Sequence, residues 1–225
     1  VELAGPVKKI TLGNKEVVEA KTVIVASGSA YRKLGIPDED RLSGYGVSWC
    51  ATCDGAFYRE KTVAVVGGGD SAMEEATFLT RFADKVYVIH RSENLRASAA
   101  MLERARNDLK IEFVLNATVE HIYGDDLVSG IGIVDTQSGA ETTVDLSGLF
   151  IAIGSDPRTH VVHGQLDLTS EGTIAVEGRT SHTNLDGVFA AGDVVDSSYR
   201  QAITAAGSGC VAALDAQHYL EALAQ

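Results

Sequence analysis

The chain has 225 residues, of which 45% are hydrophobic, and this length suits one large globular domain or two small ones. Its 31 acidic residues outnumber its 19 basic ones, and the net charge of −12 argues against nucleic acid or an anionic membrane as the main partner. Three cysteines are too few for a disulfide framework, and no apolar run approaches the roughly 20 residues of a membrane span. With no charged-then-apolar leader in the sequence, we expect a cytoplasmic protein.

The start of the chain predicts β-structure. Val7–Leu12 and Lys15–Glu19 alternate apolar and polar residues around Gly13-Asn14, which is a hairpin signal, and Thr22–Ala26 is typical of a buried strand. The chain begins in what resembles the middle of a hairpin, so we expect a further segment upstream. Glycine and proline then break any periodicity between residues 35 and 46, which predicts a linker or a domain crossing.

A close pair of cysteines, Cys50 and Cys53, follows this linker. Such a pair can be half of a structural zinc site, two free core thiols or a redox-active disulfide. A closed zinc site needs four ligands and the chain has no second CxxC, so we favour the disulfide. Asp54, beside the pair, can cap a turn or protonate a departing thiolate, and we favour the acid. Cys210 shares a predicted helix face with apolar residues, which predicts a core cysteine.

Strand, glycine turn, helix and strand succeed one another after the cysteine pair. Thr62–Val66 and Val86–Ile89 are apolar, and Ser71–Ala83 between them has the periodicity of a helix. A second helix over Ser98–Leu109 leads to a strand over Ile111–Leu115. This order predicts an α/β fold with a Rossmann-like βαβ unit.

The turn of this unit, Gly67–Ala72, fits the GxGxxA pattern of dinucleotide-binding sites. The first glycine allows the tight turn, the third lets the backbone approach a pyrophosphate, and the alanine lets helix and strand pack closely. A glycine turn without a ligand is the alternative, but strand, helix and strand all stand where the motif requires them. The predicted nucleotide contacts of the turn are Gly67, Gly69, Asp70, Ser71 and Ala72.

The end of the second strand selects the nucleotide. NAD binders carry an acidic residue there for the ribose 2′-hydroxyl, whereas this chain has His90 and Arg91. Arg91 and Arg96, on the following loop, can neutralise a 2′-phosphate with planar guanidinium groups. A solvated basic turn is the alternative. Because the chain is otherwise so acidic, we expect NADP(H) and include all three residues in the site.

The rest of the chain predicts further strands and a C-terminal helix. Three short strands around residues 124–126 and 137–139 are joined too tightly for helical crossovers, which predicts an antiparallel meander. Leu149–Ile153 is apolar on both faces, as in a buried parallel strand. The remaining predicted elements are strands at Thr173–Val176 and Val188–Ala190 and a long helix from Gln201.

Several motifs together resemble those of the low-molecular-weight, flavin-containing thioredoxin reductases, in the pyridine nucleotide-disulfide oxidoreductase family. The likeness runs over almost the whole chain. The matching stretches are Ala26-Ser27-Gly28 in place of the family's ATG, Trp49–Gly55, Gly67–Ala72, His90–Arg96, and Gly187–Asp193 continuing to Arg200-Gln201-Ala202.

The resemblance implies a domain plan. A nicotinamide-nucleotide domain, residues 38–155, would be inserted into an FAD domain whose pieces are residues 1–37 and 156–225. The family's first glycine motif, which holds the ADP half of FAD, has no counterpart in this sequence, so we expect it upstream. We therefore expect the 225 residues alone to be inactive and the complete enzyme to be a homodimer.

The resemblance also implies the chemistry. In such enzymes NADPH reduces FAD, FAD reduces the cysteine pair, and the pair reduces thioredoxin. By likeness, Cys53 faces the flavin and Cys50 attacks the protein substrate, while Asp193 holds the ribityl chain of FAD. The remaining cofactor-binding residues that the likeness implies are Gly154, Gly192, Arg200, Gln201 and Ala202.

One motif departs from the family pattern. The nucleotide motif usually reads HRR followed three residues later by Arg, whereas Ser92 replaces the second Arg here. This removes one positive charge and weakens the case for NADPH over NADH. Two other functions stay open: a reductase of the same architecture that serves a peroxiredoxin-type partner, and a nucleotide-binding module without turnover.

Overall fold

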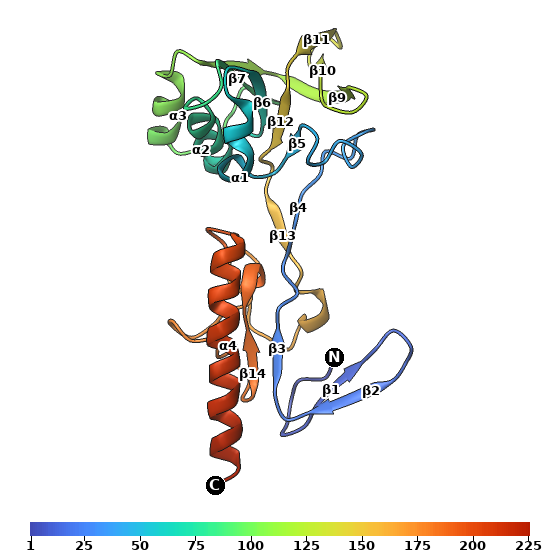
Figure 1. Cartoon of the computed structure of the whole chain (residues 1–225), viewed down its shortest axis with the longest axis vertical. Helices are drawn as coiled ribbons and strands as arrows, with labels where there is room; N and C mark the ends of the chain where they lie inside the picture. The colour runs from blue at the N-terminus through green and yellow to red at the C-terminus, as the bar shows by residue number, and fades with distance from the viewer. The chain divides into compact units, whose positions relative to one another are not determined.

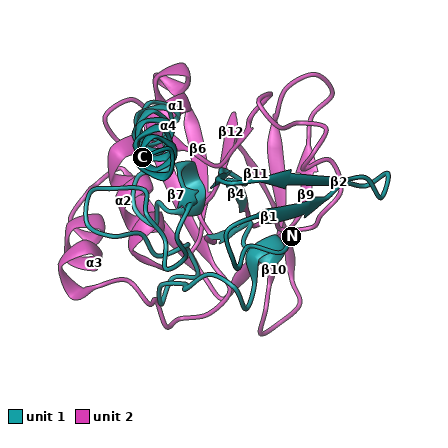
Figure 2. Ribbon diagram, turned by 90° about the horizontal axis from the view of Figure 1, so that it is seen from below, with its two compact units in different colours: residues 1–30, 155–225 teal, residues 31–154 magenta.

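The computed structural model describes residues 1–225, which form two compact units (Figure 2). Unit 2 is the continuous segment Tyr31–Gly154, and unit 1 combines Val1–Ala30 with Ser155–Gln225. Strands β4 (Ser29–Tyr31) and β13 (Ser155–Pro157) lie where the chain passes from one unit to the other. None of the helices has both the length and the apolar composition needed to cross a lipid bilayer.

Unit 2 is built on a five-stranded parallel sheet in the order β5-β12-β6-β7-β8. The bounds of these strands are Val47–Ser48 (β5), Thr62–Val66 (β6), Lys85–His90 (β7), Ile111–Leu115 (β8) and Gly148–Ile151 (β12). Helix α2 (Asp70–Leu79) connects β6 to β7, and α3 (Ala99–Arg106) connects β7 to β8 (Figure 1). This arrangement confirms the Rossmann-like α/β fold.

The sheet of unit 2 is buried on both faces. Successive side chains of a strand point to opposite sides, so one strand contributes to two core clusters. In β6, Val63 and Val65 belong to one core cluster with residues of α2 and α3. Ala64 and Val66 belong to another, which contains Ile131 of the meander. The strand therefore carries an almost continuous apolar sequence, as parallel strands covered on both sides do.

The second core cluster is completed by the predicted antiparallel meander. It consists of β9 (Ala117–Tyr123), β10 (Gly130–Asp135) and β11 (Glu141–Asp145), in the order β11-β10-β9. At the β10–β11 turn, Asp135 Oδ1 accepts hydrogen bonds from the backbone N–H groups of Gln137 and Ser138. The bonds from Ser138 and Gln137 hold the pKa of Asp135 below its ordinary value.

Helices α2 and α3 of unit 2 are shorter than predicted. The α2 helix ends at Leu79, and residues 80–83 form a turn. Thr77 and Thr80 donate their hydroxyl groups to backbone carbonyls three or four residues earlier, a local bond that competes with helix continuation. The α3 helix ends at Arg106, because Asp108 turns the chain by accepting the Lys110 N–H.

Unit 1 has the predicted hairpin, β1 (Lys8–Thr11) with β2 (Val17–Ala20), and a parallel pair, β3 (Val23–Val25) with β14 (Val188–Ala190). The long helix α4 (Ala202–Leu223) was also predicted correctly. The short helix α1 (Ala51–Asp54) and three 3₁₀ turns complete the chain's elements, the turns being η1 (Gly55–Tyr58), η2 (His160–Val162) and η3 (Gly192–Val194).

Two predictions for unit 1 were wrong. Thr173–Val176 is not a strand: Ile174 forms only an isolated bridge with Leu168, and its N–H donates to Val194 O. Cys210 is not a core residue but an exposed free thiol. The α4 helix packs on the β3–β14 pair through Ala212 and other small residues, so the face that carries Cys210 is left outside.

Candidate functional site

Cys50 and Cys53 are joined by a disulfide bond, as predicted, with their Cα atoms 5.3 Å apart. Cys50 is the N-cap of the short helix α1 (Ala51–Asp54), and its Sγ accepts the Cys53 N–H at 3.2 Å. The Thr52 hydroxyl lies 3.3 Å from the same sulfur. Cys50 is half-buried and Cys53 is exposed. After reduction, both donors can stabilise a negative charge on Cys50, which favours its thiolate form.

Asp54 lies at the end of α1, half-buried, and its Oδ2 accepts a hydrogen bond from Ser48 Oγ at 2.7 Å. Its side chain does not cap the η1 turn, so the structure gives no support to the capping alternative. Burial, and then the negative charge of Asp54, raise the pKa of Tyr58. A cavity of about 260 Å³ borders Asp54, and its side-chain lining includes Tyr45, Phe57, Tyr58, Lys61 and Leu127.

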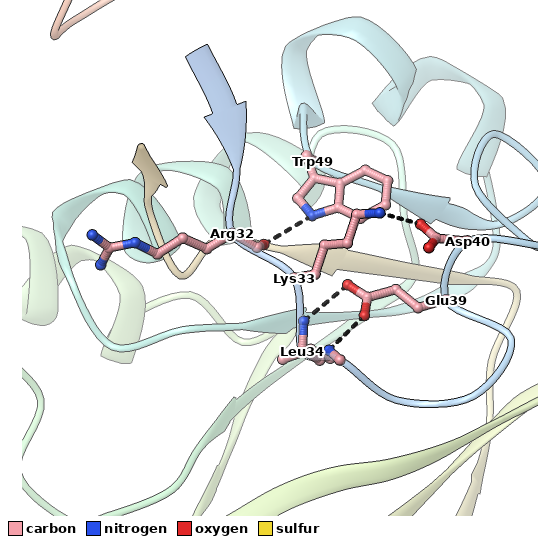
Figure 3. Close-up of polar contacts among 7 residues, drawn as sticks. Arg32, Lys33, Leu34, Glu39, Asp40 and Trp49 are labelled. Atoms are coloured by element: carbon pink, nitrogen blue, oxygen red, sulfur yellow. Dashed lines mark hydrogen bonds and ion pairs between the residues drawn. The ribbon is translucent and has the colours of Figure 1, made fainter. Parts of the chain in front are cut away.

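Trp49 fixes the backbone immediately before Cys50. Its indole N–H donates to the carbonyl of Arg32 at 3.2 Å (Figure 3), and its ring stacks on Tyr31 with 6.4 Å between centroids. Both partners belong to the first residues of unit 2. The disulfide therefore follows a residue that is anchored at the start of the unit.

Glu39 organises the loop between this start and the cysteine pair (Figure 3). Its carboxylate is buried and accepts the backbone N–H groups of Leu34 and Gly35 at 2.9 and 2.8 Å. An ion pair between Lys33 and Asp40 closes the same loop. This role could not be predicted from the sequence, because a single acidic residue in a loop shows no periodicity.

The glycine turn has the close contacts that its motif requires. A Cβ on Gly67 would lie 2.4 Å from Ala152 O and 2.9 Å from the Ala72 Cβ, so only glycine fits there. Gly69 is the N-cap of α2, and a Cβ built on it meets nothing within 4 Å. The first glycine thus serves packing, and the third borders open space at a helix N-terminus. That space fits the pyrophosphate of a dinucleotide.

The loop after β7 folds back onto this turn. Gly68 O accepts the N–H groups of Arg96 and Ala97 at 2.7 and 3.0 Å. Asp70 Oδ1 accepts the N–H of Ser98 at 2.7 Å. The structure therefore brings the two predicted halves of the nucleotide site together, and Asp70 holds the loop in place.

The three basic residues of the predicted nucleotide site lie at the end of β7 and on the loop that follows it. His90 packs its ring against Gly68, and its Nδ1 lies 2.8 Å from Ser92 O. The side chains of Arg91 and Arg96 are exposed and have neither a hydrogen bond nor an ion pair. Ser71 is exposed in the first turn of α2.

The other predicted cofactor-binding residues lie in different places. Gly154 is the last residue of unit 2, has φ +105°, and accepts the Arg32 N–H at 3.0 Å. In unit 1, Gly192 has φ +80° and donates its N–H to Ser208 Oγ at 2.9 Å. Asp193 follows it in η3, half-buried, and its carboxylate has no hydrogen-bond partner. Such a carboxylate fits a ligand that offers hydroxyl groups.

Asp196, which sequence reasoning missed, shapes the segment before α4. Its carboxylate accepts the backbone N–H groups of Ser198, Tyr199 and Arg200, each at 2.8 Å. Burial alone would raise the pKa of Asp196, but these hydrogen bonds outweigh it and hold the pKa below its ordinary value. Gln201 follows this segment as the N-cap residue of α4, and Ala202, the first residue of the helix, is exposed.

Comparison with known proteins shows which family the chain belongs to. Residues 2–209 match the family model described as pyridine nucleotide-disulphide oxidoreductase. A thioredoxin reductase of Mycolicibacterium smegmatis is 56% identical over 220 residues, which cover 98% of this chain and 70% of that protein. One of Streptomyces clavuligerus is 56% identical over 224 residues, 100% of this chain and 70% of that protein.

Among solved structures, the thioredoxin reductase from Streptococcus pyogenes MGAS5005 matches with a TM-score of 0.92 and 42% identity. The match covers 98% of this chain and 72% of that one. The chain therefore belongs to the pyridine nucleotide-disulphide oxidoreductase family and, within it, to the thioredoxin reductases.

Proposed function

We propose that the protein passes electrons from NADPH, through FAD and the Cys50–Cys53 disulfide, to thioredoxin. The observation that carries this proposal is the disulfide at the start of α1, with Asp54 beside it, in the same unit as a glycine turn that borders open space. The names of the relatives support thioredoxin as the substrate.

Each unit would hold one cofactor. In unit 2, the Gly67–Ala72 turn would hold the pyrophosphate of NADPH, and Arg91 and Arg96 would hold its 2′-phosphate. In unit 1, Asp193 would accept hydroxyl groups of FAD, near the segment 200–202. When bound, NADPH and FAD supply a hydride and bring two electrons to the disulfide.

The chain's own residues then carry out thiol–disulfide exchange. With two electrons and two protons, the Cys50–Cys53 bond opens to two thiols. The Cys50 thiolate, stabilised by the Cys53 N–H, attacks the substrate disulfide, and one substrate sulfur leaves. Cys53 then attacks Cys50 Sγ, which restores the disulfide and releases the second substrate sulfur. Asp54 takes the thiol proton of Cys53 as that sulfur attacks and gives it to the departing thiolate.

Single cysteine variants of the flavin-loaded enzyme test this division of roles. Cys53→Ser leaves the Cys50 nucleophile without its resolving partner, so it should trap thioredoxin as a stable mixed disulfide visible by mass spectrometry. Cys50→Ser should trap far less. Both variants should still allow NADPH to reduce the flavin at the wild-type rate in stopped-flow traces. A slowed flavin reduction in both, or equal trapping by both, would contradict the assignment.

The choice of substrate is tested with the wild-type enzyme. NADPH oxidation should proceed with oxidised thioredoxin and be much slower with an oxidised peroxiredoxin-type protein at the same concentration. The reverse order would assign the protein to another partner. A protein that binds NADPH but reduces neither substrate would be a nucleotide-binding module.

A further inference from the structure

The hydroxyl group of Ser48 joins two parts of the redox site. Its Oγ accepts the Cys50 N–H at 3.1 Å and donates to Asp54 Oδ2 at 2.7 Å. The carbonyl O of Cys50, at 3.5 Å, is a much weaker acceptor for the same hydrogen. Because a hydroxyl group has one hydrogen, that hydrogen is directed to the carboxylate.

Ser48 is itself held firmly. Ser48 is 4% exposed and lies at the end of β5, where it pairs with Phe150 of the buried strand β12. The sheet therefore restrains the backbone of Ser48, and burial restricts the movement of its side chain. A group with this geometry can act as an anchor for a less constrained neighbour.

Asp54 is such a neighbour. It is the last residue of the four-residue helix α1, and the hydrogen bond from Ser48 is the one that its carboxylate receives. The cavity beside it also contains the titratable side chains of Tyr58 and Lys61. Asp54 itself borders this cavity, so without the bond from Ser48 its carboxyl group would be free to change its orientation there.

We infer that Ser48 is a positioning residue, which holds the Asp54 carboxyl group beside the cysteine pair so that a proton on Oδ1 reaches the departing thiolate. This inference rests on the proposed function. In the step concerned, the bond between Cys50 and the substrate sulfur breaks and the Cys50–Cys53 bond forms. Asp54 Oδ1 takes the thiol proton of Cys53 as that sulfur attacks and passes it to the departing sulfur, while Oδ2 keeps its hydrogen bond from Ser48 throughout.

A double-mutant cycle tests whether Ser48 acts through Asp54. Ser48→Ala, Asp54→Asn and the double variant are compared in two assays. The first is NADPH-dependent reduction of thioredoxin by the flavin-loaded enzyme. The second is the rate at which dithiothreitol opens Cys50–Cys53, followed by alkylation and mass spectrometry, and needs neither cofactor nor thioredoxin. Melting temperatures show whether each variant is folded.

We expect Asp54→Asn to slow exchange about 100-fold and Ser48→Ala on the order of tenfold, because a misplaced acid loses part of its effect. The double variant should be no slower than Asp54→Asn alone. Ser48→Thr keeps the hydroxyl and should retain most of the wild-type rate. Ser48→Val has the shape of the Thr variant but no hydroxyl, and should not. Ser147→Ala is the control, because Ser147 lines the same cavity without a side-chain hydrogen bond.

Three results would overturn the inference: Ser48→Ala slowing exchange as much in the Asp54→Asn background as in wild type, Ser48→Val matching Ser48→Thr, or Asp54→Asn matching wild type. If Ser48→Ala fails to fold, the Thr and Val pair decides alone. A wild-type enzyme that reduces no thioredoxin would remove the proposed function, and the dithiothreitol assay would still report on Ser48.

Discussion

Arg91 and Arg96 are two guanidinium groups without a partner, on a loop tied by Arg96 N–H to the glycine turn. Replacing either with Ala should weaken NADPH binding far more than NADH binding, because each would contact only the 2′-phosphate in the proposed site. A charge-assisted contact is worth about 1.5–3 kcal/mol, or roughly ten- to a hundredfold in affinity. Calorimetric titration with both coenzymes measures this difference.

The matched control is Arg106→Ala, which removes an exposed charge at the far end of α3 and should affect neither coenzyme. Ser92→Arg, which restores the family's charge, should move the preference further towards NADPH. Equal losses for both coenzymes in the Arg91 and Arg96 variants would show that these arginines have a structural role.

The sequence predicted those functional residues that can be recognised from their spacing along the chain. The cysteine pair and the glycine turn are such cases, and both have the expected local structure. It did not predict Ser48, Glu39 or Asp196, each of which acts through hydrogen bonds that exist only after folding. Cys210 was misplaced because a helix pattern shows which residues share a face and not which face is covered.

In the β6–turn–α2 unit, we expect two glycines to respond differently to substitution by alanine. Ala at Gly67 would place a Cβ 2.4 Å from the backbone oxygen of Ala152, so β6 and β12 must move apart. We expect Gly67→Ala to lower the free energy of unfolding by about 1–3 kcal/mol. Ala at Gly69 has open space, so its stability should change by less than about 0.5 kcal/mol.

Nucleotide binding should separate these two variants in another way. The Cβ of Gly69→Ala would occupy the space that the pyrophosphate approaches, so this well-folded variant should bind NADPH much more weakly. Urea unfolding and calorimetric titration provide the two measurements. If Gly69→Ala bound NADPH as tightly as wild type, the phosphate would lie elsewhere.

Elements with strong apolar patterns were predicted to the residue, as in β6, β8 and β14. Helix ends were not, because Thr77 and Thr80 end α2 through side-chain bonds that periodicity does not register. Nor was β5, two residues long, which is a strand only because β12 lies beside it. Thr173–Val176 shows the reverse case, a strand-like sequence without a neighbouring strand to form a ladder.

No hydrophobic core cluster combines residues of both units. Two clusters contain only residues of unit 2, and two contain only residues of unit 1. The ends of unit 2 also meet, since Arg32 N–H donates to Gly154 O. We therefore expect residues 31–154 expressed alone to unfold cooperatively in urea and to bind NADPH in preference to NADH. A fragment without a cooperative transition would show that unit 2 depends on unit 1.

The parallel pairing of β3 with β14 sets an order of events during synthesis. Every strand and helix of unit 2 leaves the ribosome in one uninterrupted stretch, so its sheet can close as soon as Gly154 is clear. Val23–Val25 must wait, because its partner Val188–Ala190 is made only after the whole of unit 2. Pairing across so long an intervening chain is slow, whereas local contacts form quickly. Unit 2 should thus be folded on the nascent chain while β3 still lacks its partner β14.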